Sequence, residues 1–109
     1  MAGLLIQMWV CLDGSGTIAI LDDLNVDSAV DNGTGDYTFN IGTDYANDDY
    51  AVAGMCMLTG GVGSTGITVG LERQGTTNPA PGTVRIECVH FDEVPNDADF
   101  VGLIASGTP

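Results

Sequence analysis

The stretch from Asp31 to Ile41 reads DNGTGDYTFNI, and the fold prediction depends on the two signals it contains. Its first half is rich in Asp, Asn and Gly, which suit the backbone angles of tight turns. In its second half Tyr37, Phe39 and Ile41 alternate with polar residues, which is the period of a β-strand with one buried face. The stretch therefore predicts a turn that leads into a strand, with these three side chains in the core.

The same pattern recurs along the chain, where runs rich in Val, Ile, Thr, Tyr and Phe lie between clusters of Gly, Asn, Asp and Pro. No run has the periodicity of a helix. Strands are predicted at Leu5–Cys11, Thr17–Leu21, Tyr37–Ile41, Tyr50–Leu58, Ile67–Glu72, Thr83–Phe91 and Phe100–Ile104. The segment from Asp13 to Gly16 predicts a hairpin turn between the first two. About seven strands in 109 residues predict one all-β domain, residues 1–109, folded as an antiparallel β-sandwich.

The charge of the chain argues against one class of function. The chain contains fifteen Asp and Glu residues but only two basic residues, Arg73 and Arg85, so its net charge is -13. Nucleic-acid binding rests on clusters of Lys and Arg, so no nucleic-acid partner is expected. Apolar residues make up 44% of the chain, which favours a folded domain and suggests that neighbouring subunits cover part of its surface. The apolar run Leu4 to Leu12 is too short for a signal peptide or a membrane span, so no membrane insertion is expected.

Cysteine and tryptophan positions point to packing. Cys11, Cys56 and Cys88 each lie inside an apolar run and are predicted to be buried free thiols, which fits assembly in a reducing cytoplasm. Trp9 lies inside a predicted strand and is expected in the core rather than on a sugar-binding platform.

The polar residues give no catalytic or metal signature. His90 is the only histidine, and no nucleophile motif accompanies it, so its predicted role is structural. The acidic stretches 22–27, 31–36 and 44–49 offer oxygen ligands for Ca²⁺ but lack the spacing of an EF-hand loop, and they are interpreted as solvated turns. We expect no enzyme activity, no metal and no cofactor; a glycan hydrolase using paired carboxylates is the most distant alternative.

Two linked runs carry a resemblance to a known family. Residues 9–20 read WVCLDGSGTIAI, and residues 24–40 read LNVDSAVDNGTGDYTFN. They resemble a module of tailed-bacteriophage structural proteins, of the tail-fibre or spike-head type, over about a third of the chain. The resemblance implies a small β-sandwich that forms a homotrimer and is displayed on the virion after assembly in the host cytoplasm.

The predicted function is therefore that of a virion structural protein acting in assembly and host-surface contact. Two polar connections, residues 59–66 and 74–82, are predicted to contact a host glycan or receptor. Each contact would be weak, and many copies on one particle would raise the effective affinity by multivalency. The candidate binding residues are Thr59, Gly60, Gly61, Ser64, Thr65, Gln74, Thr76, Thr77 and Asn78. The alternative is a capsid decoration protein that binds the major capsid protein. In that case the apolar residues Leu4, Leu5 and Ile6 would form a docking edge strand.

Overall fold

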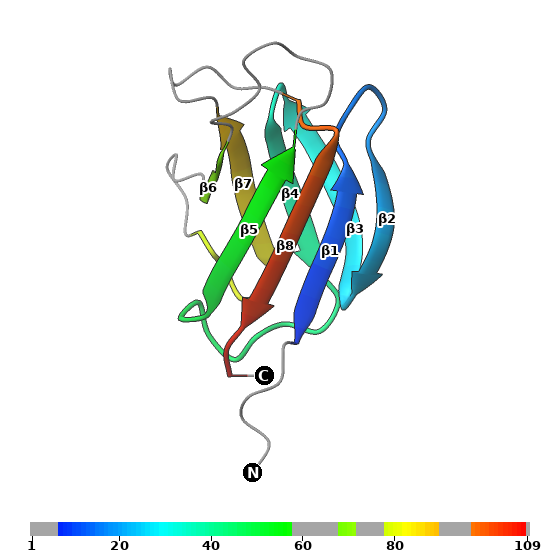
Figure 1. Cartoon of the computed structure of the whole chain (residues 1–109). Coiled ribbons are helices and arrows are strands. Elements are labelled where there is room, and N and C mark those ends of the chain that lie inside the picture. The colour runs from blue at the N-terminus through cyan, green and yellow to red at the C-terminus, as the bar shows by residue number, and fades with distance from the viewer. Residues whose placement is uncertain (1–6, 58–67, 72–77, 90–96, 109) are drawn as a thin grey trace.

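The computed structural model describes residues 7–57, 68–71, 78–89 and 97–108. These residues form eight strands and no helix: β1 Met8–Asp13, β2 Ala19–Leu24, β3 Val26–Gly33, β4 Asp36–Ile41, β5 Ala51–Met57, β6 Thr68–Leu71, β7 Thr83–Val89 and β8 Phe100–Ser106. Two antiparallel four-stranded sheets pack face to face (Figure 1). Sheet A has the order β2-β1-β8-β5, and sheet B has the order β3-β4-β7-β6. The prediction of an all-β sandwich is confirmed. In the described part of the chain, no helix is long and apolar enough to span a bilayer.

The core lies between the sheets and is built by alternation along the strands. In β4, Tyr37, Phe39 and Ile41 are buried as the sequence predicts, because every second residue of a strand points to the same side. The inward residues of the other central strands are Met8, Val10 and Leu12 of β1, Val84, Ile86 and Cys88 of β7, and Val101, Leu103 and Ala105 of β8.

Strand β3 is absent from the sequence-based prediction. Only Val26 among its residues is buried, and its pairing with β4 is interrupted by two register shifts. It lies at the edge of sheet B, where one side of the strand faces water and polar residues are tolerated. Its composition therefore lacks the apolar signal by which strands are predicted.

The chain passes from sheet A to sheet B at Asn25, the single residue between β2 and β3. Asn25 has a φ of 61°, a left-handed conformation that asparagine adopts more readily than most residues. Its side-chain amide donates to the carbonyl of Thr43 at 3.1 Å and accepts from the Thr43 amide at 2.7 Å. The corner is thus fixed to the end of β4, and it closes one side of the sandwich.

The acidic loop between β4 and β5 is held by two tyrosines. The rings of Tyr45 and Tyr50 stack with their centroids 4.1 Å apart, and both side chains are buried. The Tyr50 hydroxyl lies 2.7 Å from the carbonyl oxygen of Ala80, to which it donates, and this links the loop to the segment before β7. The loop therefore covers one end of the core while its Asp residues at 44, 48 and 49 stay exposed.

Candidate assembly surface

Sheet A carries apolar side chains on its outward side, across all four strands. The register aligns them in rows, because paired residues of neighbouring strands point to the same side of a sheet. The rows are Leu24, Trp9, Ile104 and Ala53; then Asp22, Cys11, Gly102 and Met55; then Phe100 and Met57. We call these residues the outer face of sheet A.

Several large side chains of this face are open to water. Met55 is 68% exposed, Met57 49%, and Leu24 and Ile104 are each 45% exposed. Single exposed apolar residues are ordinary on protein surfaces, but a contiguous group is typical of a contact surface. Removing a half-exposed residue of this size from water would contribute about 1 kcal/mol.

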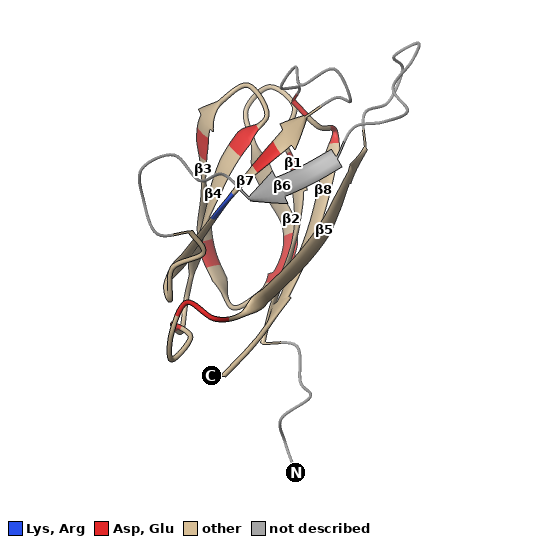
Figure 2. Ribbon diagram, turned by 90° about the vertical axis from the view of Figure 1, so that its left-hand side faces the viewer, with Lys and Arg blue, Asp and Glu red and all other residues tan. Residues whose placement is uncertain are grey.

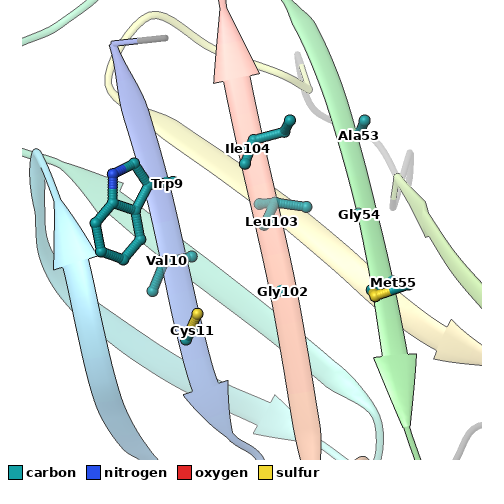
Figure 3. Close-up of a pocket in the computed structure, with 9 residues that line it drawn as sticks. All are labelled: Trp9, Val10, Cys11, Ala53, Gly54, Met55, Gly102, Leu103 and Ile104. Atoms are coloured by element: carbon teal, nitrogen blue, oxygen red, sulfur yellow. The ribbon is translucent and has the colours of Figure 1, made fainter.

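A shallow hollow of about 370 Å³ lies in the middle of the face (Figure 3). Gly102 forms its floor, because this outward position has no side chain. The hollow lies between Trp9 and Cys11 on β1 and Met55 on β5, with Ile104 beside it on β8 (Figure 3). The side chains that line it are those of Trp, Val, Cys, Ala, Met, Leu and Ile. Such a lining suits an apolar side chain of a partner better than a sugar, which needs several hydrogen-bonding side chains.

The prediction that Trp9 lies in the core is wrong. Trp9 is half-buried on the outward side of β1, and its inward neighbours are Met8 and Val10. Because β1 is apolar on both sides, alternation in the sequence does not show which set of residues faces the core.

The prediction of three buried thiols holds for one of them. All three cysteines are free; Cys88 is buried, whereas Cys11 and Cys56 are only partly buried. Cys11 belongs to the outer face, and Cys56 points inward on β5 at the margin of the core. Burial raises the pKa of both Cys88 and Cys56, so each thiol is protonated at neutral pH.

The outward side of sheet B has a different character. Its polar side chains bond to one another: Asn32 donates to Thr38 at 2.7 Å, and Asn40 donates to Ser28 at 2.9 Å. The guanidinium of Arg85 on β7 forms an ion pair with Asp36 on β4, with an N–O distance of 2.7 Å. This side is suited to water, so the two outward sides of the sandwich are not equivalent.

Charge follows the same division. Strands β5 and β8 contain no charged residue, and β1 contains only Asp13 at its end. Figure 2 shows the acidic residues on other strands and on the connecting segments, with β5 free of them. For a chain with a net charge of -13, the uncharged part of sheet A is a surface where another copy meets little electrostatic repulsion.

Most of the binding residues predicted from the sequence lie outside the described residues. This applies to Thr59, Gly60, Gly61, Ser64, Thr65, Gln74, Thr76 and Thr77, to the edge residues Leu4, Leu5 and Ile6, and to His90. Asn78 is described, and its side chain bonds to the backbone of Arg85: its amide nitrogen donates to the carbonyl at 2.8 Å, and its amide oxygen accepts from the N–H at 3.0 Å. Asn78 therefore anchors its loop to β7.

In the acidic stretches 22–27 and 31–36, Asp side chains cap local turns. An Asp31 oxygen accepts from the Gly33 amide at 3.0 Å, and an Asp23 oxygen accepts from the Val26 amide at 3.1 Å. Within the described ranges, no three His, Cys, Asp or Glu side chains gather in a way that could hold a metal ion.

The outer face of sheet A was not among the predicted site residues, although the sequence holds a signal for it. In β8 the inward Leu103 and the outward Phe100 and Ile104 are all apolar. A strand that is apolar on both sides is typical of a sheet covered on both sides.

A scan of protein-family models, a search of curated proteins and a search of solved structures found no match to this chain.

Proposed function

We propose that this chain is a bacteriophage virion structural protein that works by assembly rather than catalysis, and that copies of the chain bind one another through the outer face of sheet A. The observation that carries the proposal is the contiguous apolar surface around Met55, Met57 and Ile104 on an otherwise strongly acidic domain. Assembly covers this surface and leaves the polar side of sheet B in water.

The virion role comes from the resemblance of residues 9–20 and 24–40 to tail-fibre and spike-head modules. A sandwich whose sheet B has a polar outward side, with side chains that hydrogen-bond to one another, is compatible with a repeated surface module. The apolar hollow lacks the polar groups that recognise a glycan, so it is not the proposed host-binding site. In this proposal the polar loops at 59–66 and 74–82 contact the host instead. The resemblance also implies three copies in the assembly.

A capsid decoration protein is the second candidate, and the same outer face favours it, because an exposed apolar surface can also be covered by a different protein. The two candidates differ in what covers the face. Self-assembly covers it in the purified protein, whereas decoration leaves it open until capsid is added.

The test is the mass of the purified full-length chain by light scattering, compared with two variants. Met55→Glu places a carboxylate on the outer face of sheet A, and Val30→Glu places one at an exposed apolar residue of sheet B. We expect an oligomer that Met55→Glu dissociates and Val30→Glu leaves intact. A monomeric wild-type chain contradicts self-assembly. If that monomer binds purified capsids, the decoration candidate replaces it.

The virion role needs a separate measurement, because many proteins oligomerise. Mass spectrometry of phage particles purified from the culture that naturally expresses the chain should detect it in stoichiometric amounts. Its absence from washed particles contradicts the virion role, whatever the oligomeric state.

A further inference from the structure

Strand β5 is an edge strand of sheet A. It pairs with β8 through seven consecutive residues without a register shift, and among the described residues no strand pairs with its other side. Edge strands are usually protected from further pairing by a charge, a proline or a bulge. The sequence of β5, AVAGMCM, contains no charge and no proline.

The opposite edge of the sheet is protected. Strand β2 carries Asp22 and Asp23, and its pairing with β1 shifts register between Cys11 and Leu12. Two β2 edges brought together would place carboxylates against carboxylates. The two edges of sheet A therefore differ, because only β5 lacks charges that would repel a second acidic chain.

The sequence of β5 is complementary to itself in side-chain size. If two copies pair antiparallel about a two-fold axis at Gly54, each residue at position 54 + n faces residue 54 - n of the partner strand. Ala53 then faces Met55, Ala51 faces Met57, and Val52 faces Cys56. On the outer side each long Met lies over a small Ala, and on the inner side two medium-sized residues meet.

Gly54 suits the axis of such a pair. Its Cα already lies close to β8, since an added Cβ would be 2.7 Å from the Leu103 side chain and 2.8 Å from the Gly102 carbonyl. The position therefore requires glycine, and two glycines facing each other place no side chain on the inner side of the sheet at the axis of the pair.

We propose that two copies of this chain join through their β5 edges, antiparallel and centred on Gly54, so that the two copies of sheet A form one continuous eight-stranded sheet. This inference rests on the proposed function as an assembling module, but it places the contact between copies at the β5 edge instead of on the outer face of sheet A. The partner of the β5 edge is a second copy of the chain, because β5 is uncharged and its side chains are complementary in size to those of a second, antiparallel β5. The pairing is two-fold, so it is an alternative to the trimer that the resemblance implies.

The experiment combines the mass of the full-length chain with a third variant. Met55→Glu lies on the edge strand, and Ile104→Glu lies on the same outer face but on β8, away from the edge. Edge pairing predicts a wild-type dimer whose mass is halved by Met55→Glu and unchanged by Ile104→Glu. A trimer, or dissociation by both variants, overturns edge pairing and leaves assembly through the face standing. A wild-type monomer overturns both.

A covalent test fixes the register. Val52→Cys places a thiol opposite Cys56 of the partner strand, whereas within one chain the two positions lie four residues apart, about 13 Å, which is too far for a disulfide. Incubation with oxidised glutathione should convert each such thiol pair into a disulfide, with release of two reduced glutathione molecules. We expect a reductant-sensitive dimer band that is lost in Val52→Cys combined with Cys56→Ser. A dimer in solution without this band overturns the proposed register.

Discussion

The hydroxyl of Tyr37 donates a 2.9 Å hydrogen bond to the backbone carbonyl of Gly14 and joins the two sheets at one end of the sandwich. Tyr37 belongs to β4 of sheet B, and Gly14 directly follows β1 of sheet A. Asp97 adds to the junction, because its carboxylate accepts from the Gly35 amide at 2.8 Å. Three segments far apart in the sequence are thus held together by one buried hydroxyl and one carboxylate.

Tyr37→Phe should lower the free energy of unfolding by about 1 to 3 kcal/mol, because it removes a buried hydrogen bond and leaves the Gly14 carbonyl without that donor. Tyr45→Phe is the matched control. The Tyr45 hydroxyl is buried and has no hydrogen-bond partner among the described residues, so its removal should leave stability unchanged or raised. Urea denaturation measures both; an equal loss in the two variants would contradict the role of the Tyr37 bond.

Asp36→Asn should destabilise the domain by roughly 1 kcal/mol at pH 7, as expected for a partly exposed ion pair with two bonds. The hydrogen bonds from Arg85 hold the pKa of Asp36 below its usual value. A lowered folded-state pKa stabilises the fold above the unfolded pKa of about 3.9, and this contribution is lost as pH falls through the folded-state value. The difference between wild type and variant should therefore shrink below about pH 4. Asp48→Asn, on an exposed loop, controls for the change in net charge.

Gly54→Ala should cost about 1 to 3 kcal/mol of stability, because the added Cβ would overlap Leu103 and the Gly102 carbonyl. Gly102→Ala on the neighbouring strand is milder, since its Cβ would lie 3.2 Å from the movable ring of Phe100. Thermal unfolding of the two variants compares them directly. If both unfold at the wild-type temperature, the tight approach of β5 to β8 is contradicted.

The three thiols should react in an order set by burial. A maleimide added to the native protein should modify Cys11 and Cys56 first, because both are partly exposed. Cys88 is fully buried, and burial raises its pKa, so both access and thiolate content are low. Its labelling should require unfolding and should accelerate in urea. Peptide mapping by mass spectrometry identifies the labelled residue; early labelling of Cys88 would contradict its position in the core.

The sequence predicted the elements whose alternation is unambiguous. Tyr37, Phe39 and Ile41 alternate with polar residues, so only one register buries the apolar set, and the core residues of β4 followed directly. The same holds for Val84, Ile86 and Cys88, which alternate with Arg85 and Glu87 along β7. The prediction missed β3, because an edge strand open to water needs few apolar residues.

The sequence by itself determined that this is an acidic, all-β domain with turns rich in Gly, Asn and Asp, because these properties depend on composition and on local periodicity. Only the tertiary structure decided which side of β1 and β8 faces the core, and hence that Trp9 and Ile104 lie on the surface. The physical reason is that a strand apolar on both sides contains two equivalent sets of residues. The choice between them is made by the strands that pack against it, which come from distant parts of the chain.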